Sequence, residues 1–263
     1  TTEIYTLSLH DALPIYAALI RFTVQQVNGQ VPVIVGAGSN VTARAIRHSQ
    51  VAQREGADAL LILNPYYNKP TEEGIFLHYK SIAENVNLPI ILYNVPGRTG
   101  SNMRAALTLR IAREIPGIVA IKEASGDLNQ IMEIIANRPD GFLVYSGDDA
   151  MTLSIIAAGG DGCISVVANQ VPSEFSRMIH AALANDLDLA RNLHYKLLRL
   201  MNLNFIESNP IPVKTCLYMM GLLQNEFRAP MISMTNSSNL QVLHEELRTL
   251  EIAVNDRSAE LIA

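Results

Sequence analysis

Two residues at the carboxyl ends of predicted strands have side chains that could act together on a carbonyl group. Lys122 ends the apolar run 119–122, and Tyr93 ends a similar run at 91–93. Burying an ammonium ion is unfavourable, and burial shifts a lysine towards the free amine that forms Schiff bases. A phenol can both donate and accept a proton, so Tyr93 suits proton transfer at the same carbon centre. The two strand ends therefore predict amine catalysis on a carbonyl.

An arginine follows the Tyr93 strand, in the Gly-Arg-Thr-Gly segment 97–100. The guanidinium of Arg98 suits bidentate binding of a substrate carboxylate. Plainer interpretations exist for each residue. Lys122 could extend past the strand end to solvent, Tyr93 could pack its ring in the core, and Arg98 could be a solvated loop residue. Their joint placement at strand ends favours the functional interpretation.

The elements that must position these residues are repeated βα units. Short apolar runs alternate with amphipathic segments of helical period, which implies a parallel sheet covered on both faces. We predict strands at 32–36, 59–64, 89–94, 119–123, 142–146 and 162–167. We predict helices among them at 16–27, 41–55, 72–85, 103–114, 128–137 and 150–158. We expect residues 39–40, Thr71 and Asp127 to cap three of these helices.

The chain after residue 169 has a different pattern, with helical segments and no predicted strand. These segments lie at 172–185, 187–203, 212–223 and 239–254. The fold class is thus α/β, a (β/α)8 TIM barrel with a C-terminal helical region. Because such a barrel has eight strands, we predict that the first two are lacking. The predicted domains are an incomplete barrel at 16–185 and a helical region at 186–263.

Residues 1–15 (TTEIYTLSLHDALPI) do not fit a strand, turn and helix pattern. They look like a translated sequencing adapter, so we predict a non-native segment and exclude it from the fold. The alternative is a divergent natural N-terminus.

Composition limits the classes of function. The 263 residues are 49% hydrophobic and 17% charged, which is enough for one sizeable core. A net charge of −5 gives no basic footprint, so nucleic acid is not an expected partner. No apolar run reaches the ~18 residues of a membrane span. Cys163 and Cys216 lack metal-ligand spacing and indicate reduced thiols in a cytoplasmic protein, although a disulfide is an alternative.

Four segments in order along the chain resemble the dihydrodipicolinate synthase family, which belongs to the pyruvate-dependent class I aldolases and lyases. They are 64–70 (NPYYNKP), 93–100 (YNVPGRTG), 119–127 (VAIKEASGD) and 209–214 (NPIPVK). The resemblance implies condensation of pyruvate with L-aspartate 4-semialdehyde to 4-hydroxy-tetrahydrodipicolinate, in lysine and diaminopimelate biosynthesis. It also implies that no metal or organic cofactor is needed, and that the protein is a cytoplasmic homotetramer built from dimers.

The resemblance assigns roles residue by residue. Lys122 corresponds to the Schiff-base lysine and Tyr93 to the proton-relay tyrosine. Tyr67 is similar to the tyrosine that enters the site of a neighbouring subunit. Arg98 corresponds to the arginine that holds the carboxylate of aspartate 4-semialdehyde.

Three more positions match segments that line the family site. Ile164 lies in a segment similar to the family's GGxGxISV motif, whose main chain passes close to pyruvate. Gly147 and Asp148 follow the preceding strand, where relatives contact the second substrate. For the glycine, a tight turn is a competing explanation.

The chain departs from the family at two places. The Gly-Thr-Thr-Gly-Glu turn, whose threonines bind the pyruvate carboxylate, has no counterpart. The substrate carboxylate then loses its main donors, and a barrel without two strands has open edges that invite aggregation. We therefore expect this exact polypeptide to be poorly soluble or nearly inactive, although its parent is an enzyme. Arg44 stands where lysine-inhibited relatives often carry an acidic residue, so we expect weak or no inhibition by lysine.

Two alternative functions remain open from the residues. Another Schiff-base aldolase of the superfamily could cleave N-acetylneuraminate or a 2-keto-3-deoxy sugar acid, although Arg98 and the segment 209–214 argue against it. A non-catalytic truncated barrel is the alternative from a different class. A pyruvate adduct on Lys122 distinguishes an enzyme from a non-catalytic barrel.

Overall fold

The computed structural model describes residues 13–255, which form two compact units that meet in sequence between Ile164 and Ser165. The first unit is built on one sheet of six strands in the order β1-β2-β3-β4-β5-β6, and every neighbouring pair is parallel. The strands are β1 (Ile34–Gly36), β2 (Ala59–Leu63), β3 (Ile90–Asn94), β4 (Ile118–Glu123), β5 (Leu143–Ser146) and β6 (Gly162–Cys163).

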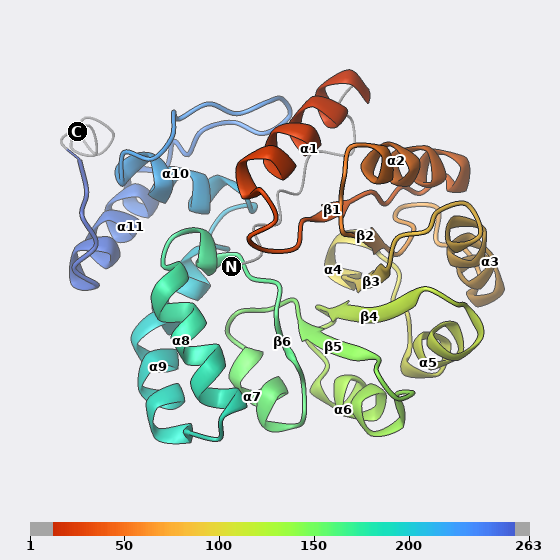
Figure 1. Cartoon of the computed structure of the whole chain (residues 1–263). Coiled ribbons are helices and arrows are strands. Elements are labelled where there is room, and N and C mark those ends of the chain that lie inside the picture. Colours follow the sequence, from red (N-terminus) through yellow and green to blue (C-terminus); the bar gives the residue numbers. More distant parts are fainter. Residues whose placement is uncertain (1–12, 256–263) are drawn as a thin grey trace. The chain divides into compact units, whose positions relative to one another are not determined.

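Helices alternate with the strands of this unit and, apart from the short α4 at the end of β3, lie along the outer side of the curved sheet (Figure 1). They are α1 (Leu13–Val27), α2 (Thr42–Arg54), α3 (Glu72–Ala83), α4 (Pro96–Thr99), α5 (Ala105–Glu114), α6 (Leu128–Asn137) and α7 (Thr152–Ala157). Two predicted caps are confirmed. Thr71 accepts a hydrogen bond from the backbone N–H of Gly74, and Asp127 accepts from those of Asn129 and Gln130.

Both faces of the sheet are buried, which explains why the strands read as continuous apolar runs. Alternate strand residues face the helices and join the main core; among them are Leu60, Ile62, Leu92, Ile121 and Val144. The residues between them form a smaller inner layer of Leu61, Ile91, Ala120 and Ile164. Tyr93 and Tyr145 pack against this inner layer, so the inner face is where side chains with chemistry gather.

The second unit is helical in the part that the structure describes. It contains a 3-10 helix η1 (Val167–Asn169) and the helices α8 (Pro172–Leu183), α9 (Leu187–Leu203), α10 (Ile211–Met219) and α11 (Ser237–Thr249). The helices α8 and α9 pack against each other, and α11 packs against both α9 and α10. This arrangement matches the predicted change from alternating units to helices alone.

Three local differences from the sequence predictions have physical reasons. The predicted cap at Ser39 is wrong, because Val41 is the N-cap residue of α2 and Ser39 Oγ accepts from the Val41 amide instead. Strand β6 is two residues long, because the chain soon turns into η1. The predicted loop at 96–99 is a short helix, since Pro96 fixes a helical φ at its start and Gly100 ends it at φ 71°.

The structure therefore shows an α/β fold with a parallel sheet in the form of a half barrel. The predicted segment 1–15 falls mostly on residues outside the described range, and its last three residues begin α1. In residues 13–255, no helix is both long and apolar enough to cross a membrane. Cys163 and Cys216 are both free thiols.

Candidate active site

The register of the sheet places Tyr93 and Lys122 side by side at the carboxyl ends of β3 and β4. Lys122 is only 7% exposed, and its Nζ lies 4.5 Å from the centroid of the Tyr93 ring. Within residues 13–255 this amine takes part in no hydrogen bond or ion pair. A buried amine without a carboxylate partner is available to attack a carbonyl carbon, with a phenol beside it to carry protons.

Gly147, which the sequence analysis places among the residues that line the site, lies directly against Lys122. The amide of Gly147 donates to the carbonyl of Glu123 at 2.7 Å. A Cβ atom at position 147 would lie 3.0 Å from Lys122 Cε and 2.7 Å from Ala124 Cβ. Glycine is therefore required at position 147 by close packing around the lysine, and not by a left-handed backbone conformation.

Ile164 joins the same inner layer of the sheet. Its amide donates to the carbonyl of Ser146 at 2.9 Å, and its side chain is buried beside Tyr93 and Tyr145. The sequence-predicted residues Lys122, Tyr93 and Ile164 thus share one face of one sheet.

Asp148 follows Gly147, but its carboxylate is already engaged with the backbone. Its Oδ1 accepts from the amides of Ala150 and Met151 at 2.9 and 3.2 Å. Its carbonyl accepts from the hydroxyls of Ser146 and Thr152, both at 2.7 Å. These bonds fix the turn that leads into α7, so a contact with the second substrate stays a prediction.

Arg98 lies on α4, immediately after the strand that carries Tyr93. The helix is held by bonds from the amides of Arg98 and Thr99 to the carbonyl of Val95, at 2.9 and 3.0 Å. Arg98 is an exposed residue. The arginine is therefore close in sequence to the Tyr93 and Lys122 pair and mounted on an ordered turn.

Tyr67 is held in an unusual backbone conformation. Its φ is 69°, and the amide of Asn68 bonds to the carbonyl of Tyr66 at 2.8 Å, which closes a strained three-residue turn. Its own amide donates to the carbonyl of Thr99 at 3.1 Å, so this turn is tied to the segment that carries Arg98. The Tyr67 side chain is 88% exposed, and it points away from its own core.

The structure adds two groups near the lysine that the sequence analysis did not propose. Tyr145 of β5 pairs with Lys122 on the side opposite Tyr93, and burial together with the Asp161 carboxylate raises the pKa of its hydroxyl. Glu123 is fully buried at the end of β4, and burial raises the pKa of its carboxyl. A signal for Glu123 exists in the sequence, because Asn94 and Glu123 have the same separation as Tyr93 and Lys122.

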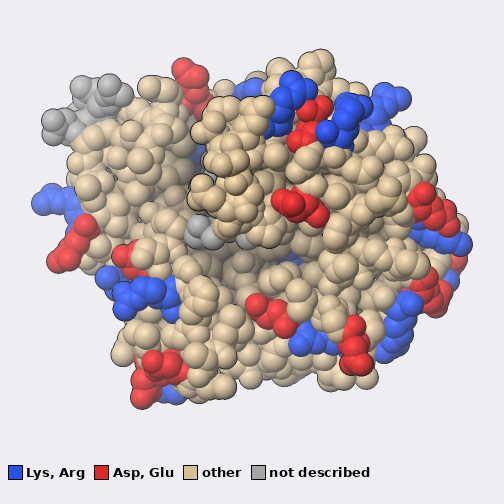
Figure 2. Space-filling model, in the orientation of Figure 1, with Lys and Arg blue, Asp and Glu red and all other residues tan. Residues whose placement is uncertain are grey.

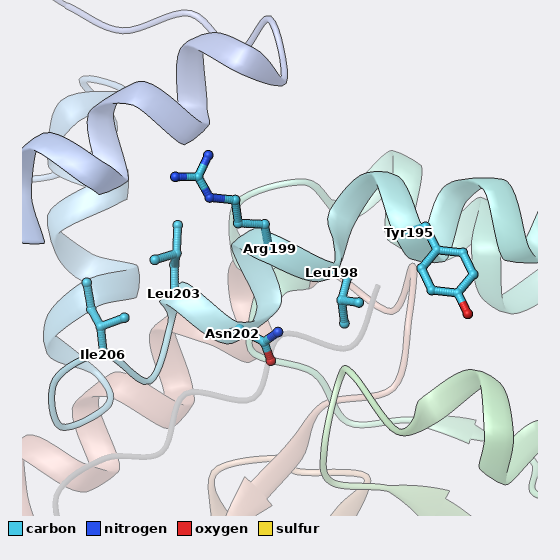
Figure 3. Close-up of a pocket in the computed structure, with 6 residues that line it drawn as sticks. All are labelled: Tyr195, Leu198, Arg199, Asn202, Leu203 and Ile206. Atoms are coloured by element: carbon cyan, nitrogen blue, oxygen red, sulfur yellow. The ribbon is translucent and has the colours of Figure 1, made fainter.

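A pocket in the second unit contains none of the predicted site residues. It has a volume of about 370 Å³ and opens along α9 (Figure 3). Its lining residues are Tyr195, Leu198, Arg199, Asn202, Leu203 and Ile206. Its walls lack a paired acid and base or a nucleophile with a base, so the pocket has no evident chemistry.

The charged residues give little guidance to a macromolecular partner. On the face drawn in Figure 2, lysine and arginine side chains are interspersed with aspartate and glutamate. Within residues 13–255, no three His, Cys, Asp or Glu side chains are grouped as metal ligands.

Two comparisons of the sequence with known proteins cover nearly the whole chain. The model of the family described as "Dihydrodipicolinate synthetase family" matches residues 1–249. A protein of Koribacter versatilis (strain Ellin345) named 4-hydroxy-tetrahydrodipicolinate synthase is 50% identical over 256 residues. That alignment covers 96% of this chain and 84% of the relative.

Solved structures show the same likeness. Dihydrodipicolinate synthase from Aquifex aeolicus has a TM-score of 0.91 at 38% identity, and the match covers 94% of this chain and 84% of that one. The chloride-inhibited dihydrodipicolinate synthase from Acinetobacter baumannii, complexed with pyruvate, has a TM-score of 0.90 at 40% identity. Here the match covers 93% and 83% of the two chains.

Proposed function

The chain belongs to the dihydrodipicolinate synthetase family, and we propose that Lys122 and Tyr93 carry out its reaction. The protein is a lyase that condenses pyruvate with L-aspartate 4-semialdehyde to give 4-hydroxy-tetrahydrodipicolinate, in lysine and diaminopimelate biosynthesis. The observation that carries the proposed roles is the buried Lys122 amine beside the Tyr93 ring, which makes no hydrogen bond or ion pair with the part of the chain that the structure describes.

The Lys122 amine would attack the ketone carbon of pyruvate to form a carbinolamine, which loses water to give an iminium. The iminium carbon is an electron sink, so a methyl proton of pyruvate can leave and an enamine forms. The enamine carbon then attacks the aldehyde carbon of the semialdehyde. The substrate's own amine displaces Lys122 from the imine carbon, which closes the ring and frees the enzyme with one water lost overall.

Tyr93 would transfer the protons that these steps require. A phenol can protonate the departing carbinolamine hydroxyl and the aldehyde oxygen, and can take protons back. Replacing Tyr93 with Phe removes this donor and leaves the ring that lies under the lysine. We expect a loss in kcat of about 10²- to 10⁴-fold, the usual size of a general acid–base contribution.

Arg98 would bind the carboxylate of aspartate 4-semialdehyde, while Ile164 and Gly147 would line the place of pyruvate beside Lys122. The support for Arg98 is its place as an exposed residue on an ordered turn next to the Tyr93 strand. A role for Asp148 would use its backbone or its second carboxylate oxygen, since Oδ1 caps the following turn.

Tyr67 would act in the site of a partner subunit, within a homotetramer built from dimers. Its 88% exposure and strained φ support a side chain held out for contact with another chain. Mixing two inactive variants, Lys122→Ala and Tyr67→Phe, tests this arrangement. Exchange of subunits should create sites that combine an intact Lys122 with an intact Tyr67 and restore turnover. If turnover does not return although native mass spectrometry shows mixed oligomers, Tyr67 acts in its own subunit.

We further propose that the six described strands are part of an eight-stranded barrel whose first two strands this chain lacks, and that the working enzyme is cytoplasmic. The support is that the described sheet has six parallel strands in sequential order, whereas a closed barrel of this kind has eight. Expressing the chain beside a version that carries a relative's N-terminal segment tests the missing strands. Comparable solubility and turnover of both would contradict the proposal.

Turnover with alternative substrates tests the proposed reaction itself. The chain completed with a relative's N-terminal segment should consume aspartate 4-semialdehyde with pyruvate, and the Lys122→Ala variant of that completed chain should not. Cleavage of N-acetylneuraminate or a 2-keto-3-deoxy sugar acid with higher kcat/KM would place the chain with another Schiff-base aldolase instead.

A further inference from the structure

A buried carboxylate lies on the opposite side of β4 from Lys122, because consecutive strand residues point to opposite faces. Glu123 is fully buried and accepts hydrogen bonds at both carboxylate oxygens. The amide of Ser125 donates to Oε1 at 2.7 Å, and Gln130 Nε2 donates to Oε2 at 3.2 Å. Asn94 Nδ2 lies 3.2 and 3.0 Å from the two oxygens.

The orientation of Asn94 is fixed by a further bond. Its Oδ1 accepts from the amide of Met103 at 3.0 Å, so its NH2 group must face Glu123. Asn102 and Gln130 exchange a pair of bonds, at 2.9 and 3.2 Å, and Asn94 Nδ2 donates to Asn102 Oδ1 at 2.8 Å. Every group that faces Glu123 is therefore a donor, and an ionised carboxylate, which only accepts, fits this place.

The network joins the elements that carry the proposed catalytic groups. Asn94 and Glu123 are paired in the β3 and β4 register, one residue beyond the pair Tyr93 and Lys122. The bonds of Asn94 to residues 102 and 103 close the segment that begins after β3 and carries Arg98. A shift of Glu123 or Asn94 would move the lysine, the tyrosine and the arginine relative to one another.

We propose that Glu123 is a positioning residue for the condensation, holding Lys122 and Tyr93 in the geometry that Schiff-base formation requires. The proposal depends on the roles proposed for Lys122 and Tyr93. Glu123 itself contacts no substrate in this proposal, since it faces the helix layer. Its contribution is the set of bonds that lock the ends of β3 and β4 together.

Exchanging the carboxylate of residue 123 and the amide of residue 94 tests this role. Glu123→Gln alone places an NH2 group against the donors of Asn94 and Gln130, and Asn94 cannot turn because of its bond from Met103. Adding Asn94→Asp moves the carboxylate to the neighbouring strand. The introduced aspartate accepts from the Met103 amide and from the NH2 group of the introduced glutamine, while Asn102 and Gln130 both flip their amides to restore complementary bonds. The double variant thus reverses donors and acceptors among the side chains of residues 94, 102, 123 and 130. The Met103 carbonyl loses only its two long contacts, with Asn94 Nδ2 at 3.4 Å and Gln130 Nε2 at 3.5 Å.

The readouts are the rate at which pyruvate forms a borohydride-trapped adduct, kcat and KM for each substrate, and the unfolding midpoint. We expect Glu123→Gln to slow adduct formation by about 10- to 100-fold, the usual effect of misplaced reacting groups. We expect a larger fall in kcat than rise in the KM for pyruvate. The double variant should regain a rate within about threefold of the parent chain, as a reversed network restores the geometry.

A parent-like adduct rate in Glu123→Gln would overturn the proposal. If Glu123→Gln does not fold, the adduct rate of the double variant tests the proposal instead. Its recovery supports the proposal, and a folded double variant with a slow adduct rate contradicts it. These results differ from a failure of the proposed function, in which the unaltered chain itself forms no adduct on Lys122.

Discussion

Replacing Gly147 with alanine perturbs the position of Lys122 without changing the chemistry of any group proposed to react. The added methyl would lie 2.7 Å from Ala124 Cβ, 3.0 Å from Lys122 Cε and 3.2 Å from the Glu123 carbonyl oxygen. The φ of Gly147 is not positive, so alanine can adopt the backbone conformation itself. The effect of the substitution is therefore steric, and it acts on the atom next to the reacting nitrogen.

The size of the effect follows from these contacts. Carbon atoms pack at about 3.5 to 4.0 Å, so the Lys122 side chain or the strand ends must move by roughly 0.5 to 1 Å. Overpacking of this kind lowers the free energy of unfolding by about 1 to 3 kcal/mol. A displacement near 1 Å of a reacting group can slow a reaction by about 10²-fold. We expect pyruvate adduct formation to slow by about 10- to 100-fold.

The assay compares Gly147→Ala with a matched control, Gly36→Ala, at the end of β1. Among residues 13–255, a Cβ at Gly36 would meet no atom within 4 Å, and its φ is not positive, so this variant should behave like the parent chain. Adduct formation is followed by borohydride trapping at several times, and stability by urea unfolding. A parent-like adduct rate in Gly147→Ala would refute the reasoning that this glycine protects the placement of Lys122.

Three other predictions follow from single residues. Arg98→Ala should raise the KM for aspartate 4-semialdehyde by about 10-fold or more and leave pyruvate adduct formation unchanged; a slower adduct would contradict its role. Burial lowers the pKa of His78 to about 4, so the unfolded chain binds the proton first as pH falls below 6.5. Between about pH 7.5 and 5, the free energy of unfolding of the parent chain should therefore fall by about 2 kcal/mol more than that of His78→Gln. Equal falls in the two chains, measured by urea unfolding at each pH, would refute this. L-lysine should bind weakly, because Arg44 repels its ammonium groups; a micromolar isotherm would contradict this.

Much of the first unit could be predicted from periodicity. Strands buried on both faces leave continuous apolar runs, and Thr71 and Asp127 mark helix starts by side chains that satisfy free amides. The pairing of Tyr93 with Lys122 also follows from sequence, because parallel neighbours place their carboxyl ends together. The cap at Ser39 failed because another residue, Val41, took the N-cap position while the serine bonded to its amide.

Other features of the site depend on contacts between distant segments. The strained turn at Tyr67 is stabilised by Thr99, a residue from the next βα unit, and local sequence gives no sign of it. The orientation of Asn94 depends on Met103, and the need for glycine at position 147 depends on Lys122 and Ala124. Such features require the three-dimensional positions of neighbours, which residue types and spacing do not supply.

Trapping the imine formed with pyruvate tests the central claim most directly. The chain is incubated with pyruvate and borohydride, digested, and mapped by mass spectrometry, with Lys122→Ala as the control. The account predicts one reduced pyruvate adduct, located on Lys122 and absent from the control. A folded chain that forms no adduct, or that forms it on another lysine, would contradict the account.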